Sequence, residues 1–316
     1  MKRIAVVGLY GMSALYRVGE LPEPGETVTS RELIFEPGGK GYNQAVAALK
    51  MGGDVFFCTA VGEDVYGAAA ETELQKVFGD RCKCIRVRNQ VTAHAAVLCD
   101  RNGENEVIVH PGALAEMDGQ IVEELKQDLK ECSMLLLQCE MPLRAVESLL
   151  AYGKSQGLYT VLNPAPAAEL PDRVLKNCDL LTPNWGEAQA IAGIRGGTVE
   201  TTAERLLDRG CGAVILTLGS RGAYVRERGV PGYYQQAFRV AAADTTGAGD
   251  IFNGALCAGL MNGRDLRSAV TMAAAASAVS VTRRGVLQAV PTLEETAVFL
   301  ERERQTYDKN NSSQGL

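Results

Sequence analysis

The chain has 316 residues, of which 46% are hydrophobic and 22% are charged, and its formal net charge is −6. This length and composition allow one large α/β domain or two ordinary ones with a sizeable core, and they exclude global disorder. The acidic balance and the lack of any block of five or more basic residues argue against nucleic acid or an anionic membrane as a partner.

The cysteines and the apolar runs indicate the cellular compartment. Nine cysteines are scattered, and the closest pair, Cys82 and Cys84, lacks the two-residue gap of a zinc site. Residues 1–8 contain no apolar signal segment, and the uncharged run 268–282 is shorter than the ~20 residues of a membrane-spanning helix. We therefore expect a soluble, cytoplasmic protein with reduced thiols.

The chain opens with a short apolar strand and continues with extended segments. Residues 4–7 are apolar and stop at Gly8, a pattern typical of a strand buried on both faces. The glycines at 8 and 11 have the wrong spacing for the G-x-G-x-x-G turn of a dinucleotide-binding site. A turn cluster at residues 21–26 precedes a mostly extended stretch at 27–35.

A glycine-rich stretch at residues 37–44 then opens a helix that runs to about residue 49. Three glycines around Lys40 bring backbone close to a small polar ligand, and Lys40 and Asn43 can hydrogen-bond its hydroxyls. The alternative is a tight turn followed by a helix cap. No G-x-x-x-x-G-K-[ST] segment occurs, so the chain is not a P-loop NTPase.

From residue 55 onward, strand and helix patterns alternate. The predicted strands are 55–61, 134–137, 159–162, 180–182 and 214–218, and the predicted helices are 65–78, 121–130, 144–156, 186–192, 202–209 and 266–281. This alternation predicts a mostly parallel sheet with helices on both faces, which binds ligands at the carboxyl ends of its strands.

One region departs from that alternation. Residues 94–99 and 106–110 read as a hairpin around the Asn-Gly turn of 100–103. Together with the extended residues near 14–18 and 27–36, the hairpin predicts a small separate sheet. Such a sheet can act as a lid that excludes water from a site, and its exposed face can pair with a second subunit.

Polar side chains follow two of the predicted strands. Glu140 comes after 134–137, where a carboxylate faces either a ligand or solvent. Asn184 and Glu187 share one face of a starting helix, and such a pair can hold the waters of a hydrated Mg²⁺. A capping box is the alternative for this pair, and the two roles are compatible.

A bend of small residues and hydroxyls at 217–222 suits the phosphates and ribose of a nucleotide, or is a plain β-turn. The loop at 282–285 offers carbonyls to a monovalent cation, with solvated arginines as the alternative. The last residues, 305–316, are polar and predict a frayed tail.

The stretch 244–250, Asp-Thr-Thr-Gly-Ala-Gly-Asp, carries the strongest chemical signal. Small residues expose backbone N–H groups at a helix start, where free donors and the helix dipole attract an anion. Asp250 beside these donors suits removal of a proton from an attacking hydroxyl, which is a phosphoryl- or acyl-transfer arrangement. Asp250 as a helix N-cap is the alternative.

Residues 38–44 and 244–250 resemble the two signature segments of the ribokinase-like, phosphofructokinase-B-type sugar kinases. Segments 24–28, 163–166 and 217–222 are similar to further parts of that family, and the resemblance covers about residues 3–303. It implies a three-layer α/β/α sandwich with a mostly parallel central sheet of about nine strands and a small β-sheet lid. Residues 1–304 would form one domain, with lid strands from about 10–36 and 92–110, and the enzyme would commonly dimerise through the lid.

The implied activity is ATP-dependent phosphorylation of a primary hydroxyl of a small sugar, with ribose as the default, Mg²⁺ as cofactor and K⁺ as a further cation. By this resemblance Asp250 is the base, and Gly247, Ala248 and Gly249 form the anion hole. The residues implied to face the sugar are Gly11, Ser13, Gly39, Lys40, Gly41, Tyr42, Asn43, Glu140 and Asp250. Those implied for ATP are Asn184, Glu187, Thr217, Leu218, Gly219, Ser220, Arg221, Gly222, Gly249 and Ala274, and those for potassium are Asp244, Thr246, Ser280, Arg283, Gly285 and Ala289.

The chain departs from the family where the sugar is gripped. Gly11 and Ser13 stand where the family has an Asn and an Asp that clasp adjacent sugar hydroxyls, and Tyr42 stands in place of a small residue. Each lost hydrogen bond to a carboxylate costs about 1.5–3 kcal/mol. Another substrate, such as a nucleoside, another pentose or a hexose, is therefore the alternative. A sugar-sensing protein without catalysis is a third reading, against which the intact Asp250 argues. Ala274 and Ala289 also replace side chains that are polar in relatives.

Overall fold

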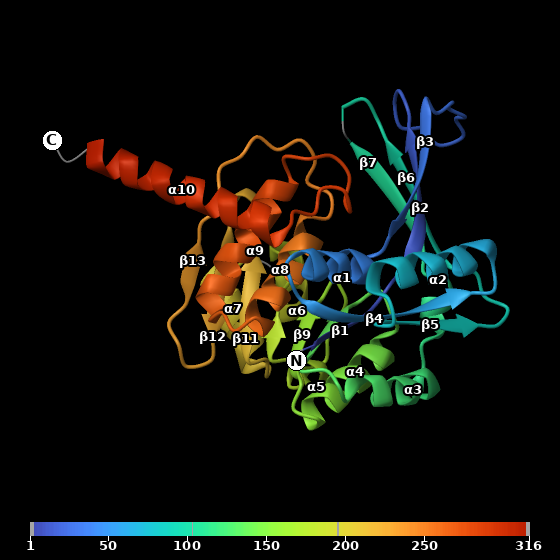
Figure 1. The fold of residues 1–316 in the computed structure, drawn as a ribbon, viewed down its shortest axis with the longest axis horizontal. Coiled ribbons are helices and arrows are strands. Elements are labelled where there is room, and N and C mark those ends of the chain that lie inside the picture. Colours follow the sequence, from blue (N-terminus) through green and yellow to red (C-terminus); the bar gives the residue numbers. More distant parts are fainter. Residues whose placement is uncertain (1–2, 103, 195, 314–316) are drawn as a thin grey trace.

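The computed structural model describes residues 3–102, 104–194 and 196–313. Its main feature is a central sheet that, in these residues, has nine strands in the order β13-β12-β11-β10-β9-β8-β1-β4-β5 (Figure 1). The strands are β1 (Arg3–Val7), β4 (Asp54–Gly62), β5 (Cys82–Val87), β8 (Met134–Gln138), β9 (Tyr159–Asn163), β10 (Leu180–Leu181), β11 (Ala213–Thr217), β12 (Ala223–Glu227) and β13 (Tyr233–Gln235). All neighbours are parallel except at the β11–β12 and β12–β13 pairs.

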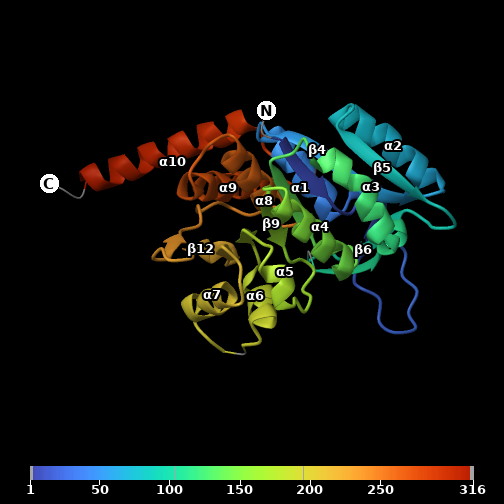
Figure 2. The same ribbon diagram turned by 90° about the horizontal axis from the view of Figure 1, so that it is seen from below.

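Helices cover both faces of this sheet (Figures 1 and 2). They are α1 (Lys40–Lys50), α2 (Val65–Phe78), α3 (Gly119–Leu129), α4 (Leu143–Ser155), α5 (Asp172–Leu175), α6 (Trp185–Ala192), α7 (Val199–Asp208), α8 (Ala248–Met261), α9 (Leu266–Ser280) and α10 (Leu293–Ser313). Two short 3₁₀ helices, η1 (Gly112–Glu116) and η2 (Gly219–Arg221), lie in connections.

Two apolar cores separate the layers. One core joins the sheet to α3–α7, and the other joins it to α1, α2, α8 and α9. In β1, Ala5 and Val7 belong to the first core and Ile4 and Val6 to the second, and none of the four is exposed. The central strand is therefore apolar at every position because both of its faces are covered. The predicted α/β/α sandwich with a mostly parallel sheet is confirmed.

A second sheet stands above the carboxyl end of β1, and we call it the lid (Figure 1). Its order is β3-β2-β6-β7, with β2 (Gly11–Arg17), β3 (Glu32–Gly38), β6 (Ala93–Cys99) and β7 (Asn105–His110). The hairpin of β6 and β7 and the small separate sheet were both expected from the sequence. Of the expected turn, Gly103 lies outside the described residues.

Some elements differ from the sequence expectation. Strands β5, β12 and β13 carry charged or polar residues at intervals, and they lie at or near the edges of the sheet, where one face is less covered. The stretch 27–31 is not a strand. Helix α10 extends away from the body to Ser313, so residues 305–313, expected to form a frayed tail, continue a helix (Figure 1).

Two further observations concern the chain as a whole. No helix among the described residues is both long and apolar enough to cross a bilayer. All nine cysteines are unpaired.

Candidate active site

The loop 244–250 ends at the first turn of α8, as the sequence predicted, but the helix begins at Ala248. Its N-cap is Gly247, with φ 74°, and a Cβ there would lie 2.5 Å from Val286 Cγ1. Only glycine fits this left-handed position without strain. Asp250 is therefore not the N-cap. The amides of Gly249 and Asp250 have no acceptor in the described part of the chain, so they remain available to a ligand.

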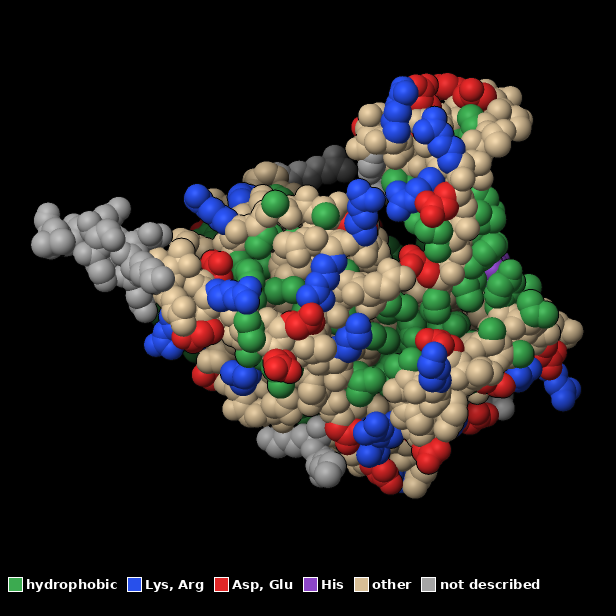
Figure 3. All heavy atoms as spheres, turned by 45° about the horizontal axis from the view of Figure 1, so that its top comes forward, with side chains coloured by type: hydrophobic (Ala, Val, Ile, Leu, Met, Phe, Trp, Pro, Cys, Tyr) green, Lys and Arg blue, Asp and Glu red, His purple; other side chains and the backbone are tan. Residues whose placement is uncertain are grey.

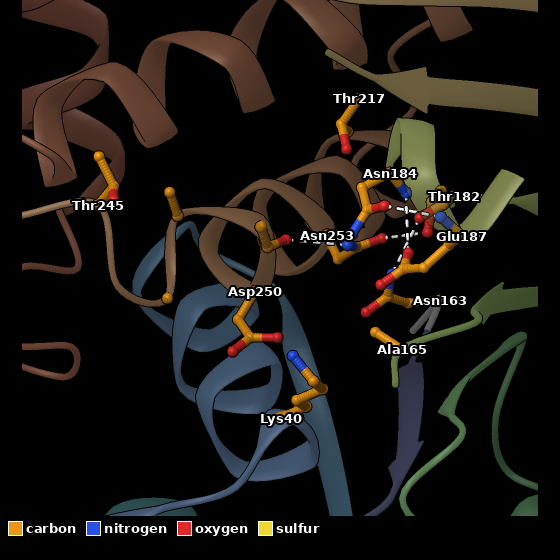
Figure 4. A pocket seen from close by; sticks show the side chains of 13 residues that line it. Lys40, Asn163, Ala165, Thr182, Asn184, Glu187, Thr217, Thr245, Asp250 and Asn253 are labelled. Atoms are coloured by element: carbon orange, nitrogen blue, oxygen red, sulfur yellow. Dashed lines mark hydrogen bonds between the residues drawn. The ribbon is translucent and has the colours of Figure 1, made fainter. Parts of the chain in front are cut away.

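A pocket of about 150 Å³ opens in front of these amides (Figure 4). It lies beyond the carboxyl ends of the central strands, where the parallel sheet predicted a ligand site. Its lining residues are Lys40, Asn163, Ala165, Thr182, Asn184, Glu187, Thr217, Thr245, Gly247, Ala248, Gly249, Asp250 and Asn253.

Asp250 is the buried acid of this pocket, with only 6% of its surface exposed. Its Oδ2 accepts a hydrogen bond from Asn43 Nδ2 at 3.1 Å, and its Oδ1 accepts one from Gln44 Nε2 at 2.9 Å. Both donors lie on α1, which packs closely against α8. The carboxylate is thus held between two helices while it still lines the pocket.

Lys40 lies opposite Asp250, and its ammonium group is directed at the Asp250 carboxylate (Figure 4). Attraction by Asp250 raises the pKa of Lys40, and this effect outweighs the opposite effect of burial. The side chain therefore carries its positive charge across the physiological pH range. A cation at this position can neutralise negative charge that develops on a bound ligand.

Glu140 supports the start of α1. Its Oε2 accepts a hydrogen bond from the Lys40 main-chain N–H at 2.8 Å, and the N-cap, Gly39, has no capping side chain. Glu140 thus supplies the hydrogen-bond acceptor that the first turn of this helix otherwise lacks. Burial, together with the nearby Asp250, raises the pKa of Glu140 to about 7.

Asn184 and Glu187 form the far wall of the pocket. Glu187 N donates to Asn184 Oδ1 at 2.9 Å, and Asn184 N donates to Glu187 Oε2 at 2.8 Å. This is the capping box that the sequence offered as one reading. Both residues still line the pocket, and Glu187 keeps its second carboxylate oxygen free of a bond in the described residues. Burial raises the pKa of Glu187.

The segment 217–222 meets the pocket only through Thr217. Thr217 pairs with Asn184 at the same edge of the sheet, and Ser220 and Arg221 are exposed in η2. Ala274 lies on α9 against the core and does not line the pocket. The structure therefore places only Thr217 of this segment in the pocket wall, with residues 218–222 and Ala274 outside its lining.

Tyr42 was expected to face the sugar, and the structure shows that it does not. Its ring is 1% exposed and packs against Tyr10, Phe57 and Phe78, with centroids at 5.0, 5.8 and 6.3 Å. Its hydroxyl donates to Glu73 Oε1 at 3.1 Å. Helix α1 turns this residue away from the pocket, so the ring fills the core under α2 and is no part of the substrate wall.

The remaining residues expected at the sugar lie on the lid and at the start of α1. A Cβ on Gly11 would lie 2.6 Å from the Ala93 main-chain oxygen, so β6 leaves no room for a side chain there. Ser13 is partly exposed, and its hydroxyl approaches Gly38. Gly41 lies directly against Gly8, which allows α1 to start at the end of β1.

The expected potassium residues come together only in part. Asp244 accepts hydrogen bonds from Thr246 N at 2.9 Å and Gly285 N at 3.1 Å, which ties the two loops together. The Arg283 side chain pairs with Glu295 of α10 at 2.7 Å, and its main-chain N–H donates to the Ser280 oxygen at 2.9 Å. Ser280 and Ala289 are buried nearby in the chain. In the described part of the chain, no group of three or more His, Cys, Asp and Glu residues could hold a metal directly.

Sequence reasoning missed the buried polar residues behind the pocket. Gln44, Gln138, Asn163, Thr182 and Asn253 are each at most 7% exposed. The available signal was the presence of amide and hydroxyl side chains inside otherwise apolar segments, because such groups are buried only with partners.

Comparison with known proteins finds that the chain is similar to carbohydrate kinases over most of its length. Residues 1–293 match the model of the pfkB family carbohydrate kinases. The ribokinase of Haemophilus influenzae is 33% identical over 303 residues, which cover 95% of this chain and 99% of that protein. The deoxyribokinase of Salmonella typhi is 31% identical, with coverage of 94% and 98%. The ribokinase structure from Thermotoga maritima is 34% identical and superimposes with a TM-score of 0.87, covering 95% of this chain and all of that one.

The raised pKa of Glu140 makes stability depend on pH. The native carboxyl keeps its proton to about pH 7, whereas the unfolded one releases it near pH 4.5. The free energy of unfolding therefore falls as pH rises between these values, by up to about 3 kcal/mol. We expect Glu140→Gln to remove this pH dependence. The melting temperature of the variant, relative to that of the wild type, should therefore be higher at pH 8 than at pH 5.

Calorimetry at pH 5, 6, 7 and 8 checks this expectation, with Glu169→Gln on an exposed loop as control. Melting curves of Glu140→Gln that run parallel to those of the wild type over this range would contradict it.

Proposed function

This chain belongs to the pfkB family of carbohydrate kinases, and we propose that it transfers the γ-phosphoryl group of ATP to a primary hydroxyl of a small sugar, with ribose as the first candidate. The similar proteins named above are two ribokinases and a deoxyribokinase, which supports a pentose as substrate. The observation that carries the proposal is the buried Asp250 carboxylate beside the amides of Gly249 and Asp250, which have no acceptor among the described residues.

In the proposed reaction, the substrate hydroxyl oxygen attacks the γ-phosphorus and the bond to the ADP oxygen breaks. Asp250 accepts the hydroxyl proton, and the amides of Gly249 and Asp250 hold the negative charge of the transferred group. Lys40 adds a positive charge on the same side of the pocket. Phosphoryl transfer depends mainly on positioning and charge stabilisation, which are the properties of this pocket.

A magnesium ion would arrive with the nucleotide and neutralise its phosphates. Asn184 and Glu187 are suited to hold its waters, since Glu187 has one carboxylate oxygen free and both side chains line the pocket. Such contact through water fits Mg²⁺, which keeps several of its waters. For potassium, the ionised Asp244 and the loop around Gly285 are the proposed holders. Burial acts to raise the pKa of Asp244, but hydrogen bonds from Thr246 and Gly285, together with the charge of Arg17, outweigh it and lower the pKa.

The lid supports a proposal of dimerisation. Its exposed apolar side chains include Leu33, Phe35, Val107, Ile108 and Val109, which are 45–69% exposed. Figure 3 shows hydrophobic side chains gathered along one flank of the lid. By register, Phe35 and Ile108 belong to one row across a single face, through Ala14 and Ala96. An apolar sheet face of this kind is suited to pairing with a second copy. The free thiols also support a cytoplasmic location.

A second candidate substrate class follows from Gly11 and Ser13. Position 11 has no room for a side chain, and position 13 carries a hydroxyl in place of a carboxylate. Glu36 pairs in register with Ser13 and is half-buried, so one carboxylate remains on the same lid face. Burial, with Asp244 nearby, raises the pKa of Glu36. A pentose with fewer hydroxyls, another sugar or a nucleoside is therefore the alternative.

Substitution of the proposed base tests the reaction. We expect Asp250→Asn to lower kcat by about 10²–10⁴-fold, because the hydroxyl loses its proton acceptor. The Kd for ATP should stay within about twofold, since the amides and the far wall are unchanged. A coupled ADP-release assay and titration calorimetry measure the two quantities.

Asp208→Asn on the exposed end of α7 is the control and should leave kcat unaltered. Wild-type turnover in Asp250→Asn would remove this residue from the role of base, and with it the main support for a catalytic reading over a sugar-sensing one.

A substrate panel tests the choice of sugar. We expect ribose to be phosphorylated with ATP and Mg²⁺, and Ser13→Asp to lower the KM for ribose by about tenfold or more, since a hydrogen bond to a carboxylate contributes about 1.5–3 kcal/mol. The panel contains ribose, 2-deoxyribose, fructose, glucose and four nucleosides, each with and without K⁺. Turnover of another compound without any for ribose at millimolar concentration would establish the second candidate and reject the first.

Light scattering tests the dimer. We expect the wild type at twice 33.7 kDa and Phe35→Asp at the monomer mass, because the charge would be buried in the paired face. Val65→Asp, at an exposed apolar position on α2, is the matched control and should remain a dimer. A monomeric wild type, or a dimeric Phe35→Asp, would contradict pairing through this face.

A further inference from the structure

Gln44 uses every hydrogen-bonding atom of its side chain. It is fully buried on α1, and its Nε2 donates to Asp250 Oδ1 and to Asn163 Oδ1, both at 2.9 Å. Its Oε1 accepts from Gln138 Nε2 at 2.7 Å. The side chain thus links the proposed base to two strands of the central sheet, β8 and β9.

A main-chain carbonyl determines the orientation of the Asn163 and Gln44 side-chain amides, that is, which position the nitrogen takes and which the oxygen. Asn163 Nδ2 donates to the Thr182 main-chain oxygen at 2.9 Å, and a carbonyl can only accept. Asn163 must therefore present its Oδ1 to Gln44, so Gln44 must present its Nε2 to Asn163. That same nitrogen faces Asp250, which means that Asp250 receives a hydrogen at Oδ1 and never meets the Gln44 oxygen.

A second carbonyl ties this chain of bonds to the first turn of α8. Asn253 Nδ2 donates to the Gly249 main-chain oxygen at 2.8 Å, and Asn253 Oδ1 accepts from the Thr182 hydroxyl at 2.5 Å. Thr182 therefore joins the bonds around Gln44 to the turn that carries Asp250 and the free amides. The side chains on this path are at most 7% exposed, so water does not compete for their bonds.

The arrangement leaves Asp250 with one amide donor on each oxygen, Asn43 at Oδ2 and Gln44 at Oδ1. Donors of this kind fix the orientation of both oxygens and leave their remaining lone pairs to the pocket. Asn43 Oδ1 is buried without a partner in the described residues, so Asn43 keeps one acceptor that no group of this part of the chain uses. Gln44, by contrast, is fully buried and does not line the pocket, so it makes no contact with a ligand there.

We propose that Gln44 is a positioning residue, which holds the Asp250 carboxylate in one orientation through a hydrogen bond whose direction is set by the main-chain carbonyl of Thr182. The inference rests on the proposed kinase function and assigns no contact between Gln44 and substrate. Gln138 donates to Gln44 from the side opposite Asp250. The Oε1 of Gln138 lies close to the Cα of Gly8 and has no hydrogen-bond partner among the described residues, so the series of hydrogen bonds stops there.

Three variants test the role. Gln44→Met keeps the length of the side chain but removes its donors, and we expect kcat to fall about tenfold to hundredfold, as for the loss of a hydrogen bond to a charged group. The KM for ATP should stay within about twofold, since Gln44 does not line the pocket. Gln138→Met, the matched control, removes only the donor to Gln44 Oε1 and should lower kcat less than fivefold.

Gln44→Glu allows a second measurement, the pH dependence of kcat, which would not change if Gln44 had only a structural role. A second carboxylate beside Asp250 would share a proton with it, so the acid limb of the kcat–pH profile should shift to higher pH by about one unit or more. The other charged groups that act on this carboxylate are Lys40, Glu140 and Glu187, and none of them is altered. Melting temperatures of all variants show whether folding is kept.

The outcomes separate this inference from the proposed function. An unchanged kcat in Gln44→Met, or an unmoved acid limb in Gln44→Glu, overturns the positioning role while the activity of the wild type stands. If Gln44→Met does not fold, the Gln44→Glu profile and an Asn163→Ala variant test the role instead. Asn163→Ala removes the acceptor that fixes the Gln44 amide, so the amide can flip, and kcat should fall at least tenfold. A wild type without activity on the whole panel would instead reject the kinase proposal itself.

Discussion

The close packing of α1 against α8 is the constraint on which the site depends. A Cβ on Gly254 of α8 would lie 2.4 Å from the main-chain oxygen of Gln44, and one on Gly41 of α1 would lie 2.6 Å from Gly8. Because these positions lack side chains, the two helices meet over the end of β1 with their first turns facing one space. This contact brings Asn43 and Gln44 to Asp250, 207 and 206 residues further along the chain.

The charges of the pocket follow from that contact. Asp250 and Glu187 line the pocket with Lys40, and Glu140 lies close enough to act on the same ammonium group, so one cation faces three acids. Burial raises the pKa values of Glu140 and Glu187, which shows that the pocket disfavours a further uncompensated negative charge. A nucleotide accompanied by a divalent cation suits such a pocket better than a bare anion, because the cation compensates the carboxylates.

Much of the fold was predictable because local patterns matched the final burial. The inner strands β1, β4, β8, β9 and β11 are short apolar runs, since helices cover both of their faces. The lid hairpin was predicted from an Asn-Gly turn. The edge strands β5 and β13 were missed because their less covered faces carry polar residues, and α10 was missed because much of it lies outside the two cores.

The sequence by itself determined the chemistry at the start of α8, since an acid that follows small residues at a helix start needs only local backbone geometry to lie beside free amides. It likewise determined the capping box of Asn184 and Glu187, a contact within one helical turn. Only the tertiary structure decided that Tyr42 faces the core and that Gln44 faces Asp250. Tyr42 and Gln44 lie on the same helix, α1. Which side of α1 meets α8 depends on packing against segments that are distant in sequence, and no local pattern in the chain encodes it.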